Sequence, residues 1–242
     1  MRFARSIALA VGIVLFATHV ARADDYPSRP ITLILPLGAG GAMDILARAQ
    51  FEPKLKERLG RPIVIENRTG GGTVIAATAT AKAPPDGYTL FMAPAGTLTT
   101  NATLYKRLPY DPAKDFAPIA LTSSVAFVLV VHPSLPVHSL KELVQYVKER
   151  PGQLAFGSTG IGATPHLAFE MIMRDAGLKM THVPYRGMPQ AVNDVVGNHV
   201  QMAFADPAGA PPLIKDGKLR PLAVSSLQRI SSLPDVPTMD EA

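Results

Sequence analysis

Short apolar runs alternate with amphipathic stretches through the first half of the chain, beyond an apolar N-terminal segment. Each run is rich in β-branched residues and leads into a turn that contains glycine or proline. Strand, turn and helix in this order, three times over, predict a parallel sheet with helices packed on it. The expected strands cover residues 31–36, 62–66 and 88–92, and the first two helices cover 42–59 and 73–83.

The pattern shifts near residue 120 and a second α/β series follows. An apolar run at 126–132 predicts a strand, and Ser139 and Glu142 have the spacing of a capping box that opens a helix to residue 150. Further strands are expected at 154–158, 180–185, 200–205 and 220–225, and helices at 164–176, 189–196 and 207–215. The economical interpretation is two α/β lobes, 24–123 and 124–224, with residues 225–242 crossing back toward the first.

The first 23 residues have the features of a secretory signal peptide. Arg2 and Arg5 precede an apolar run at 6–17, and Ala21-Arg22-Ala23 forms an A-x-A cleavage site. The run is short for a mature membrane span, although an N-terminal anchor is the alternative. The chain has no Cys, which excludes a lipoprotein anchor. We expect cleavage after Ala23 and a monomeric protein in the periplasm.

Composition narrows the possible functions. The net charge of +5 includes three arginines of the leader, and without them 21 basic residues face 19 acidic ones. This balance, without a basic cluster, argues against nucleic-acid binding. The histidines lack paired spacing and there is no Cys, so we expect no metal site and no cofactor. No pair of acids lies at matched helical positions for glycoside chemistry.

The first candidate binding loop follows the first strand. Glycines between a buried strand and a helix let the backbone approach a ligand closely, and the start of a helix favours an anion. The alternative to a binding loop is a tight strand-to-helix turn without a ligand. The loop does not match the dinucleotide-binding motif, because Met43 occupies the position that requires Gly or Ala. The candidate residues are Gly38, Ala39, Gly40, Gly41 and Asp44.

The second candidate loop follows the strand at 154–158. Thr164 is the expected N-cap of the next helix and Pro165 its first residue. His166, in the first turn, could donate to a ligand oxygen or serve as a local structural contact. The candidate residues are Ser158, Thr159, Gly160, Gly162, Thr164 and His166.

Asp206 ends a later strand just before Pro207, where it could cap a helix or accept a hydrogen bond from a ligand. A secreted hydrolase that uses Ser158 and His166 is the rival from another class. Phe156 replaces the first glycine of a nucleophile elbow, so the hydrolase motif fails. The residues favour binding over reaction.

The sequence resembles the Bug, or TctC-type, receptors of tripartite tricarboxylate transporters over nearly the whole chain after the leader. Segments that carry the resemblance are 26–31, 36–44, 64–72, 86–90, 110–116, 157–166, 183–187 and 217–224. The resemblance implies a type II Venus flytrap fold without enzymatic activity. It implies that a small carboxylate binds between the loops near 38–44 and 158–166 and passes to a membrane transporter.

Two substitutions depart from the family pattern, Met188 after Arg186-Gly187 and Pro165 where Ser is common, and both could change the ligand. Residues 233–242 resemble a segment that in the family leads into elements completing the first lobe. We therefore expect the C-terminal part of that lobe to be missing. A truncated remnant that binds no ligand is accordingly a further alternative.

Overall fold

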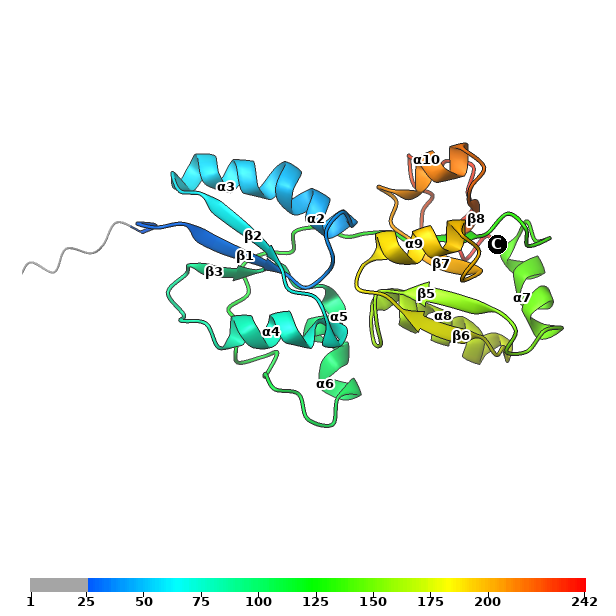
Figure 1. The fold of residues 1–242 in the computed structure, drawn as a ribbon, viewed down its shortest axis with the longest axis horizontal. Coiled ribbons are helices and arrows are strands. Elements are labelled where there is room, and N and C mark those ends of the chain that lie inside the picture. Colours follow the sequence, from blue (N-terminus) through cyan, green and yellow to red (C-terminus); the bar gives the residue numbers. More distant parts are fainter. Residues whose placement is uncertain (1–25) are drawn as a thin grey trace, which may run out of the picture.

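The computed structural model describes residues 26–242, and the predicted signal peptide lies outside this range (Figure 1). Two separate sheets with flanking helices form two lobes, joined by an extended segment that reaches the second sheet at residue 128. The predicted two-lobed α/β architecture is confirmed. The strands of the first sheet lie between residues 31 and 91, and those of the second lie between residues 128 and 224. The lobe boundary at residue 123 stays a prediction.

The first lobe is built on a parallel sheet of order β2-β1-β3. Its central strand is almost wholly buried, because helices cover both faces: α3 packs against β2, and α4 packs against β3 and β1. The elements are β1 (Ile31–Leu35), α2 (Ala42–Leu46), η1 (Ala47–Phe51), α3 (Glu52–Leu59), β2 (Ile63–Asn67), η2 (Gly71–Thr73), α4 (Val74–Ala81), β3 (Thr89–Phe91), α5 (Ala95–Leu98) and α6 (Thr100–Leu104).

The helix predicted over 42–59 is one helical run interrupted by the π-type turn η1. It ends at Gly60, whose φ of +65° is a left-handed conformation that glycine adopts without strain.

The second lobe is a mixed sheet of order β6-β5-β7-β4-β8. β5 runs parallel to β6 and β7, whereas β4 pairs antiparallel with β7 and β8. The elements are β4 (Val128–Val131), α7 (Leu140–Lys148), β5 (Ala155–Ser158), α8 (Thr164–Ala176), β6 (Thr181–Pro184), α9 (Met188–Val196), β7 (Met202–Ala205), α10 (Ala210–Lys215) and β8 (Arg220–Val224).

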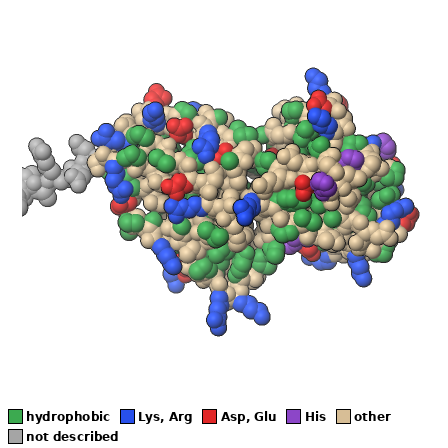
Figure 2. Space-filling model, viewed as in Figure 1, with side chains coloured by type: hydrophobic (Ala, Val, Ile, Leu, Met, Phe, Trp, Pro, Cys, Tyr) green, Lys and Arg blue, Asp and Glu red, His purple; other side chains and the backbone are tan. Residues whose placement is uncertain are grey.

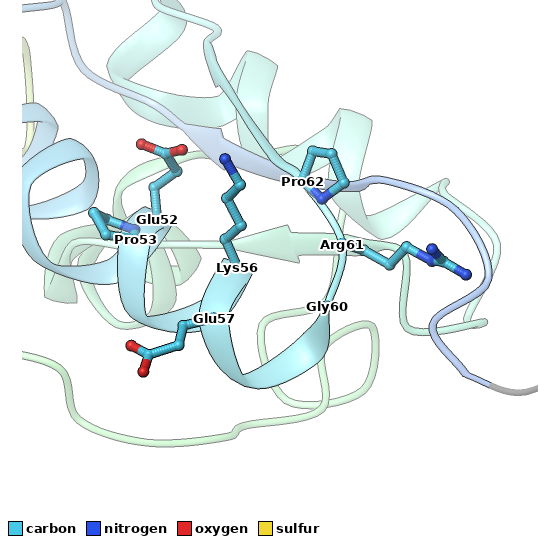
Figure 3. A pocket seen from close by; sticks show the side chains of 7 residues that line it. All are labelled: Glu52, Pro53, Lys56, Glu57, Gly60, Arg61 and Pro62. Atoms are coloured by element: carbon cyan, nitrogen blue, oxygen red, sulfur yellow. The ribbon is translucent and has the colours of Figure 1, made fainter.

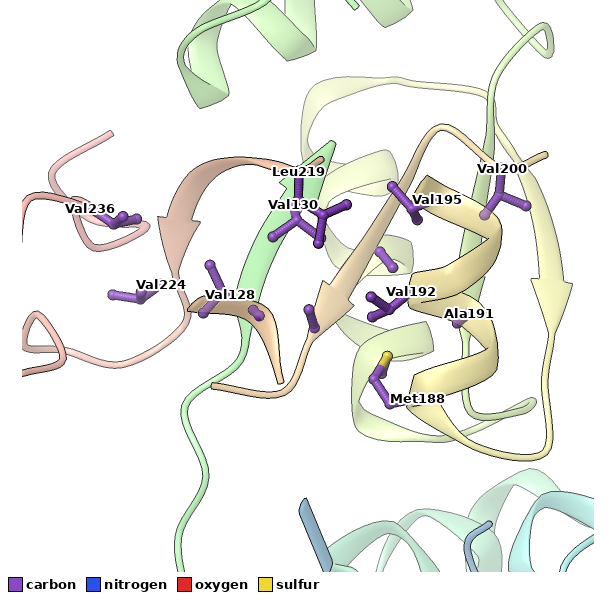
Figure 4. Packing of buried hydrophobic residues seen from close by; sticks show 13 residues of the cluster. Val128, Val130, Met188, Ala191, Val192, Val195, Val200, Leu219, Val224 and Val236 are labelled. Atoms are coloured by element: carbon purple, nitrogen blue, oxygen red, sulfur yellow. The ribbon is translucent and has the colours of Figure 1, made fainter. Parts of the chain in front are cut away.

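Both faces of this second sheet are covered by apolar clusters. On one face α9 packs against β5 and β7 and buries Met188, Ala191 and Val195, which lie along one side of the helix, in a cluster that also holds residues of β4 and β8 (Figure 4). On the other face Phe169 of α8 packs with Phe156 of β5 and with residues of α7. The two cores fix the carboxyl end of β5, where the second candidate loop begins.

The C-terminal segment differs from its prediction. Residues 225–242, expected to cross back to the first lobe, lie against β8 of the second lobe. Thr238 bridges to Val224 in parallel, and Met239 N donates to the Val224 carbonyl at 2.9 Å. Val236 is buried in the α9 cluster, so its apolar side chain is what holds the segment there.

The capping box predicted at α7 is present in modified form. Ser139 Oγ accepts from Glu142 N at 3.1 Å, while the Glu142 carboxylate accepts from His138 N rather than from Ser139 N. We expect Ser139→Ala to lower the free energy of unfolding by about 1 kcal/mol, because a helix donor loses its acceptor. Chemical denaturation measures this change. Ser231→Ala, at an exposed position, is the control, and equal stability of both variants would contradict the cap.

Candidate functional site

A small cleft lies between the lobes, at the carboxyl ends of β1, β2, β3 and β5, and the space-filling view shows the lobes meeting at a narrow waist (Figure 2). It offers about 70 Å³ of space. Ligands in α/β proteins bind at this end of the strands. The lining residues are Leu37, Gly72, Thr73, Pro94, Gly96, Thr97, Asn101, Phe127, Thr159, Gly162, Ala163, Thr164 and Pro165.

The wall from the first lobe is a turn that the sequence analysis did not place in the site. Gly70, Gly71, Gly72 and Thr73 all have positive φ, between +57° and +120°. They turn the chain from β2 into the start of α4. The run of three glycines directly after a strand is the signal that could have identified this wall.

Buried hydrogen bonds hold that turn in place. The hydroxyls of Thr73 and Thr97 lie 2.7 Å apart, and Asn101 Nδ2 donates to the Gly72 carbonyl at 3.1 Å and contacts the Tyr110 hydroxyl at the same distance. The Tyr110 hydroxyl donates to the Thr97 carbonyl at 2.7 Å. Burial raises the pKa of Tyr110, so the phenol stays neutral and remains a donor. The wall is therefore rigid and uncharged.

The wall from the second lobe is the loop between β5 and α8. Of the residues predicted there, Thr159, Gly162 and Thr164 line the cleft. Gly160 faces the other lobe, since a methyl group on it would lie 3.7 Å from Gly72 Cα. Ser158 and His166 do not line the cleft, and their side chains hold the loop from behind.

Two hydrogen bonds provide this support. Ser158 is fully buried, and its Oγ accepts from Gly160 N at 3.1 Å and lies 2.6 Å from His182 Nε2. His166 Nδ1 accepts from Gly162 N at 3.2 Å. Burial and the neighbouring His166 lower the pKa of His182 to about 4, so this imidazole is neutral at physiological pH.

The start of α8 differs by one residue from its prediction. Thr164 was expected as N-cap, but the N-cap is Ala163, which has extended dihedrals, so Thr164 is the first helical residue and Pro165 the second. Ala163 N donates to the Gly160 carbonyl at 3.2 Å, and the loop therefore ends one residue earlier than expected. The Thr164 amide therefore belongs to the first turn, where N–H groups have no partner within the helix.

The first candidate loop, Gly38 to Asp44, is largely satisfied by the protein itself. Gly40 N donates to Asp44 Oδ2 at 3.0 Å, and Gly38 N donates across to the Arg186 carbonyl at 3.0 Å. Burial favours a higher pKa for Asp44, but hydrogen bonds from Gly40, Asn67 and Arg48 hold it below its usual value. The residues Gly38, Ala39, Gly40 and Gly41 do not line the cleft, where only the preceding Leu37 appears.

Asp206 also has a different role from the predicted cap. Helix α10 begins only at Ala210, because Gly209 N and Ala210 N both bond to the Asp206 carbonyl and form a turn. The Asp206 carboxylate instead reaches the first lobe, where it accepts a hydrogen bond from Ala42 N at 3.1 Å. Burial raises the pKa of Asp206. Asp206 thus joins the two lobes.

The cleft is therefore lined by uncharged residues, both polar and apolar. None of its lining residues is charged, and the 13-residue helix α8 directs its N-terminal, electropositive end toward it. Such an arrangement binds an anion through amides and hydroxyls. Hydrolysis by Ser158 does not fit, because the hydroxyl is inaccessible and its partner is His182, not His166.

A wider depression of about 520 Å³ lies elsewhere, along α3 and the start of β2 (Figure 3). The exposed side chains of Lys56, Glu57 and Arg61 and the partly buried Glu52 line its rim, so it is an open surface feature. Among residues 26–242, no three His, Asp or Glu side chains gather in a metal-binding arrangement. No helix in that range is both long and apolar enough to cross a membrane.

The lowered pKa of His182 predicts a dependence of stability on pH. An unfolded chain takes up a proton on this histidine near pH 6.5, whereas the folded protein does so only near pH 4. The unfolded state therefore binds more protons between these values, and stability falls as the pH is lowered through this window. When melting curves are recorded from pH 8 to 4.5, the melting temperature of His182→Gln should fall less than that of the parent protein. An unchanged slope would contradict the neutral, buried imidazole.

Comparisons with known proteins show the family of this chain and its fold. Residues 46–242 match the family described as "Tripartite tricarboxylate transporter family receptor". The chain is 36% identical to the periplasmic binding protein BugD, covering 89% of this chain and 72% of that one, with a TM-score of 0.84.

Two further solved structures contain acids. Rpa4515 of R. palustris, solved with adipate, is 37% identical, with a TM-score of 0.85 and coverage of 90% of this chain and 72% of that one. MatC of Rhodopseudomonas palustris, solved with bound malate, is 32% identical, with a TM-score of 0.84 and coverage of 90% and 74%. These relatives are solute-binding receptors, not enzymes. The chain belongs to the Bug, or TctC-type, family of receptors for tripartite tricarboxylate transporters.

Proposed function

We propose that this protein captures a small organic carboxylate in the cleft between its lobes and presents it to a tripartite membrane transporter. The observation that carries the proposal is the uncharged cleft at the start of α8, faced by the rigid turn at Gly72 and Thr73. Relatives with the same fold are known with adipate and malate in place. We further propose that the mature receptor acts as a monomer in the periplasm after cleavage behind Ala23.

The site residues divide into three roles in this proposal. The ligand carboxylate takes hydrogen bonds from Thr159 and Thr164, directly or through water, and Gly162, whose N–H is bonded to His166, forms the cleft wall between them. Ser158, Gly160 and His166 shape that loop. The loop Gly38, Ala39, Gly40 and Gly41, together with Asp44 and Asp206, holds the lobes together beside the ligand.

A thermal-shift and calorimetric screen tests this function. At least one acid among adipate, malate and aromatic acids should raise the melting temperature of the mature protein, residues 24–242. A ligand that binds only the folded state stabilises that state by mass action. Adipamide, which lacks the charge, is the control for adipate. A protein that melts cooperatively and responds to no acid would contradict the proposal and favour the non-binding remnant.

A pair of glycine variants tests the cleft itself. Gly162 and Gly152 have nearly equal left-handed φ values, +79° and +76°, so alanine strains the backbone equally at both. Only at Gly162 does the added methyl group collide with Leu104 of the opposite lobe. We expect Gly162→Ala to weaken carboxylate affinity by about tenfold or more, through hindered closure. Gly152→Ala should keep the parental affinity, and equal affinities would place the site elsewhere.

A further inference from the structure

The loop that lines the cleft needs support from outside itself. Gly160 and Gly162 have φ values of +122° and +79°, conformations that glycine adopts readily but that also leave the free loop many alternatives. In the folded protein each of the two amides donates to a polar side chain: Gly160 N to Oγ of the buried Ser158, and Gly162 N to Nδ1 of the partly buried His166. The loop is held in one shape by these acceptors.

Both acceptor side chains contact the same residue, His182 of β6. Its ring lies 4.1 Å from the His166 ring and 5.0 Å from the Phe156 ring, measured between centroids. Its Nε2 is 2.6 Å from Ser158 Oγ, the shortest of the three contacts of that hydroxyl. His182 therefore lies beneath the loop, on the side away from the cleft lining.

The single Ser158 hydroxyl proton has two possible acceptors. The hydroxyl can donate to the Gly160 carbonyl at 3.2 Å or to His182 Nε2 at 2.6 Å, and the shorter contact is the stronger bond. With the proton directed to Nε2, a lone pair of Oγ is left for Gly160 N. The low pKa of His182, about 4, keeps the ring neutral, and the tautomer with its proton on Nδ1 leaves Nε2 free to accept.

We propose that His182 is a positioning residue for carboxylate binding: by accepting the Ser158 hydroxyl proton, it orients the lone pair that holds the Gly160 amide and so fixes the binding loop. The Ser158–His182 pair has the short contact of a nucleophile and its base, but Ser158 is fully buried, so the pair orders the loop instead of reacting. This inference rests on the proposed function, since it assigns a role within the same site.

Three variants of the mature protein separate positioning from packing. His182→Phe keeps a ring between Phe156 and His166 but removes the acceptor. His182→Gln places an amide near the position of Nε2 and restores a hydrogen-bonding partner for Ser158. His138→Phe, at an exposed histidine before α7, is the control for the substitution itself.

Amide hydrogen exchange of Gly160, followed by NMR, requires no ligand and decides whether His182 holds the loop. We expect exchange about tenfold faster in His182→Phe, with near-parental rates in His182→Gln and His138→Phe, because losing one buried hydrogen bond changes local opening by about this factor. Parental exchange in His182→Phe would overturn the proposal.

Calorimetry with adipate and malate then measures the consequence for binding. His182→Phe should weaken the affinity for an acid that binds the parent by about tenfold, and His182→Gln should recover most of it. Unchanged affinity in His182→Phe despite faster exchange would also overturn the positioning role. If the parent binds neither these nor any other carboxylate, the proposed function fails, while the exchange data still decide whether His182 fixes the loop.

Discussion

The close approach of two backbones across the lobe junction is the constraint on which the site depends. Gly38 and Gly187 meet so tightly that a methyl group on either would lie 3.3 Å from the other lobe. A methyl group on Gly72 would come within 2.9 Å of the Ile161 carbonyl. Real Cβ atoms rarely tolerate such distances, so glycine at these positions lets the strand ends of the two lobes face each other directly. The cleft is narrow because these contacts surround it.

The protein uses its own carboxylates at the junction and leaves neutral donors for the ligand. Asp44 and Asp206 accept the Gly40 and Ala42 amides, so the first loop is satisfied before any ligand arrives. The cleft lining has no fixed cation, and the electropositive start of α8 is its main source of attraction for an anion. A second carboxylate in the ligand would therefore meet hydroxyls, amides and water rather than an arginine.

The sequence predicted the lobes well because strand and helix periodicity is local. It also singled out Thr159, Gly162 and Thr164, which line the cleft in the structure, since a glycine turn before a helix is visible in the sequence. It could not show that Asp206 crosses to Ala42, nor that His182 lies under Ser158, because both contacts join distant segments. Strand boundaries alone do not show which glycine loop faces the cleft, so the wall formed by Gly70, Gly71 and Gly72 was not predicted.

Amide chemical-shift mapping during titration with a bound carboxylate tests the central claim most directly. The account predicts the largest shifts at residues 159–165 and 72–73, which line opposite walls of the cleft, with small shifts at the amides of Gly38, Gly40 and Ala42, which do not line it. Shifts centred on residues 38–42 instead, with the second loop unaffected, would contradict it.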